Sequence, residues 1–485
     1  MIASVSRPAL IGLAAGLAAA LSACTALPPV PETLAEPRPP LVIPAESMRL
    51  GVMAATLDGR IVRAERAGER FIPASNTKIF TAAAAFRYLP GLGTADPETA
   101  TSLVRLPAEA GAAPSLVIVG RGDATLGDGA ACTDNCLHQL ADAVATRGIM
   151  RVGDVIGDAT YFPHEPFGLG WSWNNLPFYF GAPVSALTVN GNAATLRVGP
   201  DTTEGAPVMA SWAEGDGLLG VRNEAVTGPP GSENLLSVLR LPGSDEVVLT
   251  GTLPADAQPR DYLLSVPDAS VAAARRLIRL LQARGIIVEG AARARTRRDA
   301  PLAGEELARL AAPPLLTAVV NVSKDSDNLS AELLLHHIAR AQGGEGAKTG
   351  LDAVHAMLEE AGIGRTEIEL FDGSGLSPYN RISPDAAVRF LAWTAHQPWG
   401  EAFLATLPVG GNSGSLSRRF RGTPLEGRIF AKTGTVQGVN ALSGFLVAAS
   451  GERLVFSVIA NDRPADAGSV LPLIDALLLE IAAAN

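Results

Sequence analysis

Cysteine is scarce in this 485-residue chain, which contains three, at positions 24, 132 and 136. A structural zinc site usually takes four ligands in two pairs, and Cys132 and Cys136 have no second pair, so we expect no metal. The two cysteines lie in the segment Cys-Thr-Asp-Asn-Cys and fit a disulfide if the protein is exported to an oxidising compartment. The alternative is a pair of reduced thiols.

Positive charge is outweighed by negative charge. The chain has 39 Lys and Arg against 49 Asp and Glu, for a formal net charge of −10. An acidic chain without a basic block is poorly suited to binding a phosphate backbone, so we expect no nucleic-acid partner. Hydrophobic residues make up 47% and charged residues 18%, which is typical of a globular protein. The length predicts two or three domains.

Long apolar runs are missing except near the N-terminus, where Arg7 precedes the run Ala9–Leu21. This run has the length of a signal-peptide core and is short for a membrane span. It ends in Leu21-Ser22-Ala23-Cys24, which resembles the lipobox of bacterial lipoproteins. The alternative is an ordinary signal peptide cut at small residues nearby. If Cys24 is lipidated, Thr25 implies anchoring to the outer membrane of a Gram-negative bacterium, on its periplasmic side.

The patterning beyond the N-terminus predicts a mixed α/β fold. Residues 48–69 read as a hairpin, residues 429–436, 441–449 and 453–461 as strands, and residues 465–484 as a final helix. A long stretch of different character separates the two ends of this domain. The expected division is a signal peptide 1–23, a Pro-rich tether 24–46, a catalytic domain 47–92 with 265–485, a first inserted domain 93–165 with 236–264, and a β-rich inserted domain 166–235.

Ser75 and Lys78 are the first candidate catalytic residues. They are spaced i, i+3 at the predicted start of a helix, which places a hydroxyl beside an amine on one face. A serine becomes a good nucleophile when a base takes its proton, and a desolvated lysine can be that base. The Ser-x-x-Lys pair is common by chance, so its meaning depends on the rest of the chain.

Two further motifs follow in order: Ser326-Asp327-Asn328 before a predicted helix, and Lys432-Thr433-Gly434-Thr435 on a predicted strand. Ser326 and Asn328 are suited to relaying protons and to hydrogen bonding with a substrate amide. Lys432 adds positive charge that keeps Lys78 neutral and attracts a carboxylate. We expect Gly434 to leave room for an extended substrate along the strand edge, and the backbone N–H groups of Ser75 and Thr435 to form an oxyanion hole.

A second Lys-Thr-Gly triplet, Lys348-Thr349-Gly350, spells the third motif as well. It lies in a Gly-rich stretch before a predicted helix, whereas the copy at Lys432 begins a strand that has a predicted antiparallel partner. We therefore assign the motif to the Lys432 copy.

The three motifs together mark class A β-lactamases and penicillin-binding proteins. The separation of Ser75 from Ser326 is much larger than in class A β-lactamases. The chain resembles the penicillin-binding D-alanyl-D-alanine carboxypeptidase/endopeptidase family (low-molecular-mass, class C type), also in the segments 122–126, 170–175 and 372–377. The resemblance implies a transpeptidase/β-lactamase-like domain, with an antiparallel sheet flanked by helices, interrupted by two small domains. It implies hydrolysis of D-Ala bonds in peptidoglycan stem peptides through an acyl-enzyme on Ser75, covalent binding of penicillins and other β-lactams, and no cofactor.

Asp158 is a further candidate, because an acidic residue of the inserted module can meet the free amine of the stem peptide in enzymes of this kind. Its alternative is a turn aspartate. His336 and His337 are adjacent on a predicted helix, which favours a packing or surface role over metal binding. The aromatic cluster 171–180 fits buried core or a sugar-stacking surface. Two other functions remain open: a β-lactamase, and a lipid-anchored peptidoglycan-binding scaffold with vestigial catalysis.

Overall fold

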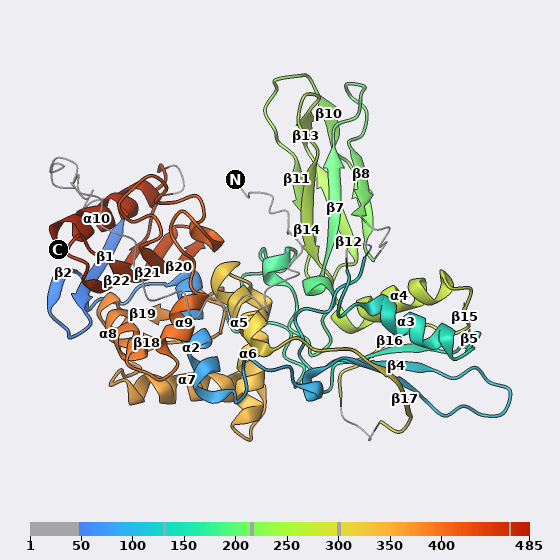
Figure 1. Cartoon of the computed structure of the whole chain (residues 1–485). Helices are drawn as coiled ribbons and strands as arrows, with labels where there is room; N and C mark the ends of the chain where they lie inside the picture. Colours follow the sequence, from blue (N-terminus) through green and yellow to red (C-terminus); the bar gives the residue numbers. More distant parts are fainter. Residues whose placement is uncertain (1–47, 130–131, 214–217, 298–301, 465–466) are drawn as a thin grey trace.

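The computed structural model describes residues 48–129, 132–213, 218–297, 302–464 and 467–485. The expected signal peptide, the tether and Cys24 lie outside these ranges. Figure 1 shows three bodies: one built from both ends of the chain, a second beside it, and a β-rich third that projects away from both. Within the described ranges, no helix combines the length and the apolar character needed to cross a membrane.

The first body is a five-stranded antiparallel sheet in the order β2-β1-β22-β21-β20. Its central strands β21 and β22 are buried along nearly their whole length, because helices cover both faces. Alternate residues of β1 separate into two cores: Met53 faces α2 and α8, and Val52 faces α10. The strands are β1 (Arg49–Thr56), β2 (Ile61–Glu65), β20 (Ile429–Val436), β21 (Val439–Val447) and β22 (Arg453–Asn461).

Helices of this body carry the motif residues toward the edge strand β20. The helix α2 is almost wholly buried, as its alanine-rich sequence allows, and α5 and α6 pack beside it. A short pair of strands, β18 (Ile368–Glu369) and β19 (Arg381–Ile382), follows α7 and precedes α8. The helices are α2 (Lys78–Tyr88), α5 (Leu315–Lys324), α6 (Asn328–Ala341), α7 (Gly346–Glu360), α8 (Pro384–Ala395), α9 (Gly400–Thr406) and α10 (Leu471–Ala484).

The second body is a five-stranded sheet in the order β16-β6-β4-β3-β17, packed against two helices. This corrects the predicted return to the catalytic domain at residue 265, because β16 pairs with β6 and β17 pairs with β3. The element bounds are β3 (Ser102–Arg105), β4 (Leu116–Val119), α3 (Leu137–Thr146), β5 (Arg151–Val152), β6 (Val155–Asp158), α4 (Ala269–Gln282), β15 (Ile287–Val288), β16 (Ala292–Arg295) and β17 (Glu305–Arg309).

The third body is all β, as its alternating short runs predict. Residues 236–264 belong to it and not to the first inserted domain, because β14 pairs with β7, and β12 pairs with β9 and β11. The expected assignment of residues 236–264 to the first inserted domain was therefore wrong. The strands are β7 (Ala193–Gly199), β8 (Met209–Trp212), β9 (Gly220–Asn223), β10 (Val226–Gly228), β11 (Ser237–Leu239), β12 (Glu246–Thr250), β13 (Thr252–Pro254) and β14 (Arg260–Ser265).

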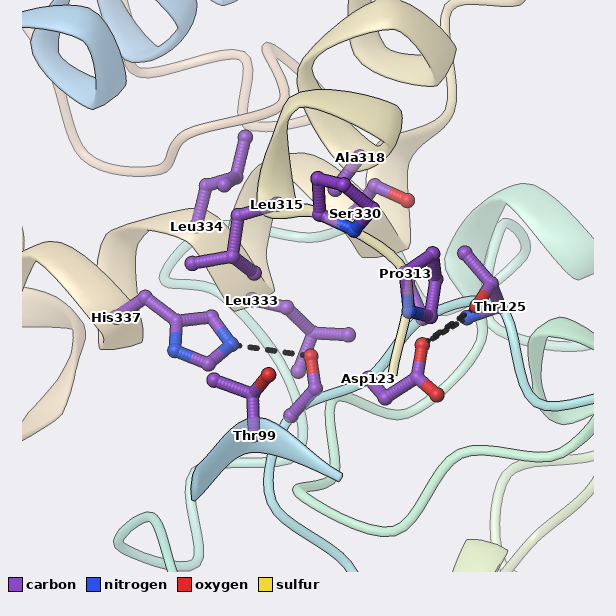
Figure 2. Close-up of a pocket in the computed structure, with 13 residues that line it drawn as sticks. Thr99, Asp123, Thr125, Pro313, Leu315, Ala318, Ser330, Leu333, Leu334 and His337 are labelled. Atoms are coloured by element: carbon purple, nitrogen blue, oxygen red, sulfur yellow. Dashed lines mark hydrogen bonds between the residues drawn. The ribbon is translucent and has the colours of Figure 1, made fainter. Parts of the chain in front are cut away.

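Helix α6 also forms the junction between the first two bodies. Both histidines of this helix are buried there, with Phe162 stacked on His336 and the Nε2 of His337 3.1 Å from the carbonyl oxygen of Gly122. Burial lowers the pKa of each imidazole to about 4, so both are neutral at pH 7. Figure 2 shows His337 and Asp123 lining a small pocket in this junction. The two histidines thus pack at this junction, which is one of the two roles expected for them.

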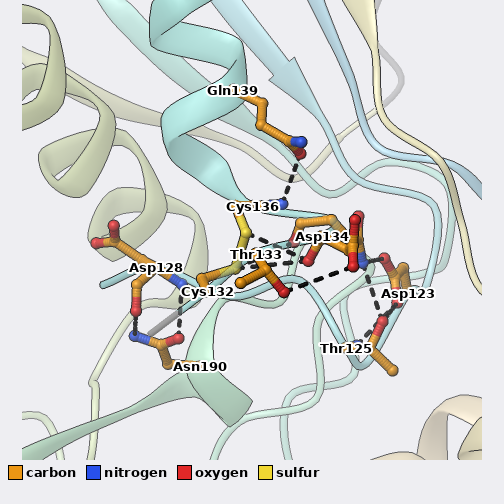
Figure 3. Close-up of a disulfide and its surroundings, with 10 residues drawn as sticks. Asp123, Thr125, Asp128, Cys132, Thr133, Asp134, Cys136, Gln139 and Asn190 are labelled. Atoms are coloured by element: carbon orange, nitrogen blue, oxygen red, sulfur yellow. Dashed lines mark hydrogen bonds between the residues drawn. A yellow bond between two sulfur atoms is a disulfide. The ribbon is translucent and has the colours of Figure 1, made fainter. Parts of the chain in front are cut away.

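Cys132 and Cys136 are joined in a disulfide, the pairing expected from the sequence. Cys136 caps the N-terminus of α3, and its backbone N–H donates to the side chain of Gln139 at 2.9 Å. Figure 3 shows the disulfide beside Asp123, whose carboxylate accepts a hydrogen bond from the amide of Asn135 at 2.6 Å. The disulfide therefore closes a loop at the start of α3, in the first inserted domain.

Candidate active site

Ser75 and Lys78 lie at the junction of two helical segments. Residues Ala74–Thr77 form a 3-10 turn, η1, and α2 begins at Lys78. Side chains three residues apart eclipse one another in a 3-10 turn, which brings the two groups together. The Lys78 Nζ lies 3.0 Å from the Ser75 Oγ. Ser75 is half-buried and reachable, whereas Lys78 is 1% exposed.

The Lys78 amine has two further partners, and both are acceptors. Its Nζ donates to the Asn328 Oδ1 at 2.6 Å and to the Ser374 carbonyl oxygen at 2.5 Å. The orientation of the Asn328 amide is settled by its other end, because the Asn328 Nδ2 donates to the Phe180 carbonyl oxygen at 2.7 Å. A neutral amine has two N–H groups and one lone pair. With both N–H groups engaged by these acceptors, the lone pair is directed at the Ser75 hydroxyl.

Burial shifts the Lys78 amine toward this neutral form. Burial lowers the pKa of Lys78 to about 8, against the opposing charges of Asp372, Asp327 and Glu332. About a tenth of the amine is then unprotonated at pH 7. The site thus holds a lysine that is able to accept a proton near neutral pH, beside a serine that can give one.

The second and third motifs meet across the same site. The Lys432 Nζ, on the edge strand β20, donates to the Ser326 Oγ at 2.8 Å. Burial and the neighbouring Lys78 lower the pKa of Lys432 well below its ordinary value. Asp327 has a structural place, because its carboxylate caps α6 by accepting from the Ser330 backbone N–H at 2.6 Å. The structure therefore brings Ser75, Lys78, Ser326, Asn328 and Lys432 together.

The remainder of the third motif sits on the edge strand, next to the Ser75 turn. Thr433 donates from its hydroxyl to the Ser415 Oγ at 2.7 Å, and Thr435 is exposed. A Cβ at Gly434 would lie 2.6 Å from the carbonyl oxygen of Pro73. The absence of a side chain at Gly434 lets β20 approach the turn that carries Ser75. The structure thus explains this glycine by packing against the turn, whereas we expected it to leave room for the substrate. The competing triplet is part of α7, where Lys348 is exposed and pairs with Asp352.

Asp158 is not brought to this site. It lies on β6, its side chain is 3% exposed, and its carboxylate accepts from the guanidinium of Arg295 on β16 and from the Thr160 backbone N–H. A carboxylate paired in this way supports the sheet of the first inserted domain. Its surroundings favour the structural alternative over contact with a substrate.

The sequence reasoning missed two buried acids beside the site. Glu332 accepts from the backbone N–H groups of Gly373 at 3.1 Å and Ser374 at 2.8 Å, and burial together with the charge of Asp372 raises the pKa of Glu332 to about 8. Asp372 is 1% exposed and lies in the same loop as Gly373 and Ser374. A signal for Glu332 was present: it lies one helical turn after Asn328 within an otherwise apolar run of α6.

The aromatic cluster is only partly core. Trp173 is 55% exposed and Tyr179 is 41% exposed, whereas the indole Nε1 of the half-buried Trp171 donates to Asp372 at 2.9 Å. The stretch is therefore not a uniformly buried core, because part of its aromatic surface is exposed.

Known proteins resemble this chain along most of its length. Residues 42–477 match the model of the D-Ala-D-Ala carboxypeptidase 3 (S13) family. A D-alanyl-D-alanine carboxypeptidase of Actinomadura sp. (strain R39) is 34% identical over 452 residues, which cover 89% of this chain and 80% of that protein. The D-alanyl-D-alanine carboxypeptidase DacB of Haemophilus influenzae is 27% identical over 429 residues, covering 86% of each.

The fold has a solved counterpart as well. The crystal structure of penicillin binding protein 4 (dacB) from Haemophilus influenzae superposes with a TM-score of 0.77 at 25% identity, covering 90% of this chain and 95% of that one. The resemblance found from the three motifs is therefore confirmed over the inserted domains too. The chain belongs to the D-Ala-D-Ala carboxypeptidase 3 (S13) family of serine peptidases.

Proposed function

We propose that this chain cleaves the D-Ala-D-Ala end of peptidoglycan stem peptides through an acyl-enzyme on Ser75, with Lys78 as the general base. The observation that carries the assignment is the placement of the Lys78 amine, whose other hydrogen bonds end on pure acceptors while its Nζ is 3.0 Å from the Ser75 Oγ. The lowered pKa of Lys78 supports the same role.

In the acylation step, the Ser75 oxygen attacks the carbonyl carbon of the penultimate D-Ala while its proton passes to the Lys78 nitrogen. The N–H groups of Ser75 and Thr435 stabilise the negative oxygen of the tetrahedral intermediate. The C–N bond then breaks, and the departing D-Ala amine takes the proton held by Lys78, relayed through the Ser326 hydroxyl, which accepts from Lys432 at 2.8 Å; Lys78 is neutral again. The product is an ester between Ser75 and the shortened peptide.

In the deacylation step, a water molecule attacks the ester carbonyl and gives its proton to Lys78, which restores the Ser75 hydroxyl.

Lys432, Thr433 and Thr435 line the edge strand and are suited to the terminal carboxylate of the substrate. The amide of Asn328 orients the Lys78 amine through its Oδ1, while its Nδ2 is held by the Phe180 carbonyl oxygen. A β-lactam acylates Ser75 by the same first step. When its ring opens, the amine that would leave stays covalently attached to the acyl group. Cross-linked stem peptides contain the same D-alanyl bond, so DD-endopeptidase activity uses the same groups.

The location proposed for the enzyme follows from its substrate. Peptidoglycan lies outside the cytoplasm, and the sequence around Cys24 supports cleavage before that cysteine and attachment of a lipid to it. We propose a periplasmic enzyme anchored by this lipid to the outer membrane. A mass spectrum of the membrane-extracted protein checks this, since a mature N-terminus at a residue other than a lipidated Cys24 contradicts it.

The test of the function is release of D-Ala from a soluble peptide ending in L-Lys-D-Ala-D-Ala, followed by chromatography. Wild-type protein is expected to release D-Ala, and Ser75→Ala is expected to release none above the rate without enzyme. Ser415, the exposed neighbour of Thr433, is not a nucleophile in this scheme. Turnover by folded Ser75→Ala protein would therefore contradict the assignment.

A further inference from the structure

The two acceptors of the Lys78 amine are held in place by a loop of the catalytic domain and by a segment of the insertion. The carbonyl of Ser374 belongs to the loop 372–377, and the amide of Asn328 is oriented by the Phe180 carbonyl. The segment 169–181 of the insertion contains Phe180 and also reaches the loop at two points: the Trp171 Nε1 donates to Asp372 at 2.9 Å, and the Ser377 Oγ donates to the Leu169 carbonyl oxygen at 2.7 Å. The orientation of the base therefore depends on contacts between the inserted and catalytic domains.

Asp372 is the centre of the loop. Its carboxylate accepts from the backbone N–H of Gly375 at 2.9 Å and of Ser377 at 2.7 Å, and from the Asn380 amide at 2.6 Å, in addition to Trp171. The Ser374 hydroxyl lies 3.3 Å from it. All of these partners are donors, which is the arrangement that suits an ionised carboxylate.

The far side of the loop is pressed against the catalytic turn. A Cβ at Gly375 would lie 1.9 Å from the carbonyl oxygen of Ala74, the residue before the nucleophile. The hydroxyl of Thr81, on α2, donates to the Gly373 carbonyl oxygen at 2.8 Å. A shift of the loop therefore moves the Ser374 carbonyl relative to both Ser75 and Lys78.

We propose that Asp372 is a positioning residue for the general base. It ties the loop 372–377 to Trp171 of the insertion, and in this way it holds the Ser374 carbonyl where it orients the Lys78 amine toward Ser75. The proposal rests on the proposed function, because it assigns to Asp372 a role in the acylation of Ser75.

The charge of Asp372 adds a second effect that a purely mechanical brace would not have. The titratable groups that face Lys78 are Asp372, Asp327, Glu332 and Lys432, and Asp372 is the strongest of the acids in raising the pKa of Lys78. Removing this charge leaves the amine easier to deprotonate. Loss of the brace and loss of the charge therefore predict different changes, one in the rate and one in its pH dependence.

The experiment measures the rate of acylation by a fluorescent penicillin as a function of pH, using the whole soluble protein. Asp372→Asn is expected to slow acylation by about tenfold or more and to move the acid limb of the profile to lower pH. Trp171→Phe keeps an aromatic ring but removes the indole N–H, and it is expected to slow acylation by about tenfold without the shift. Trp173→Phe, in the same segment and 55% exposed, and Asp352→Asn, on the surface of α7, are the matched controls.

Folded Asp372→Asn protein with an unchanged rate overturns the proposal, and so does a loss of rate with an unshifted acid limb. If Asp372→Asn fails to fold, Trp171→Phe decides: an unchanged rate overturns the proposal and a slowed one supports it. Absence of any adduct in wild-type protein would instead reject the proposed function, which separates the two failures.

Discussion

Lys78 and Asn328 are 250 positions apart in the sequence, and the Lys78 Nζ donates to the Asn328 Oδ1 at 2.6 Å. The two residues begin the helices α2 and α6, which pack side by side in the catalytic domain. Between them the chain leaves this domain, forms both inserted domains and returns. The contact is made possible because the insertion starts and ends on the same side of the catalytic domain, as Figure 1 shows.

Replacing Lys78 tests whether acylation needs a neutral amine at this position. Lys78→Arg keeps a positive charge, but a guanidinium does not give up its proton in proteins, so acylation by penicillin is expected to fall by about 10²- to 10⁴-fold. The wild-type rate should rise as pH increases toward about 8, the pKa of Lys78, and the variant should lack this rise. Lys348→Arg, in the competing Lys-Thr-Gly triplet, is the control and should behave as wild type. A variant that keeps the wild-type profile contradicts Lys78 as the base.

A methyl group at Gly434 tests the approach of β20 to the nucleophile turn. In Gly434→Ala the new Cβ would lie 2.6 Å from the Pro73 carbonyl oxygen, closer than atoms tolerate, so the strand must move away from Ser75. Acylation is expected to slow by about tenfold or more while the protein remains folded. Gly220→Ala, on β9, is the control, because its nearest neighbour would be 3.7 Å away. Equal rates in both variants would show that this contact does not matter.

The buried acid Glu332 gives a pH-dependent prediction. Its pKa is raised to about 8 from 4.5, so the native state binds more protons than the unfolded state between these values, and this group's contribution to stability falls as pH rises through that window. Glu332→Gln resembles the protonated form and should remove this fall.

Urea unfolding of wild type and Glu332→Gln at pH 5 and pH 8 checks it, with the variant gaining relative stability at the higher pH. Glu332→Ala leaves the Gly373 and Ser374 N–H groups without their acceptor and should cost about 1–3 kcal/mol at either pH. A constant difference between wild type and Glu332→Gln across the two pH values would contradict the raised pKa.

The disulfide closes a short loop, since Cys132 and Cys136 are separated by 4 positions. The chain-entropy model gives about 2 kcal/mol for a loop of this length. The Cys132→Ser, Cys136→Ser double variant should lose about that free energy of unfolding and keep its acylation rate, because the loop belongs to the first inserted domain. Reduced wild-type protein should match the double variant in thermal unfolding. No loss of stability in either would contradict a stabilising disulfide.

The sequence was sufficient for what is local. Spacing and order predicted a site with Ser75, Lys78, Ser326, Asn328 and Lys432, residues that the structure brings together. Alternation predicted the hairpin and the last three strands. The boundaries of the inserted domains were missed because β16 and β17 join a sheet whose other strands lie far earlier in the chain, and periodicity carries no information on such pairing.

Residues whose partners are distant were also misread or missed. Asp158 stayed open between a substrate contact and a turn aspartate, and its pairing with Arg295 favours a structural role. Asp372 was noted only within the segment 372–377, and its bond with Trp171 could not be inferred from the sequence. Gly434 was expected to leave room for substrate, but the contact that the structure shows for it is with the backbone of Pro73, far away in the sequence. In each case the decisive contact is set by tertiary packing and not by the neighbours in the chain.

The most direct test of the account is intact mass spectrometry of the soluble mature protein after incubation with benzylpenicillin. We expect wild-type protein to gain the full mass of the drug, because ring opening retains every atom, and the modified peptide to contain Ser75. The Ser75→Ala variant should gain nothing. An adduct on the Ser75→Ala protein, or folded wild-type protein that remains unmodified, would contradict Ser75 as the nucleophile.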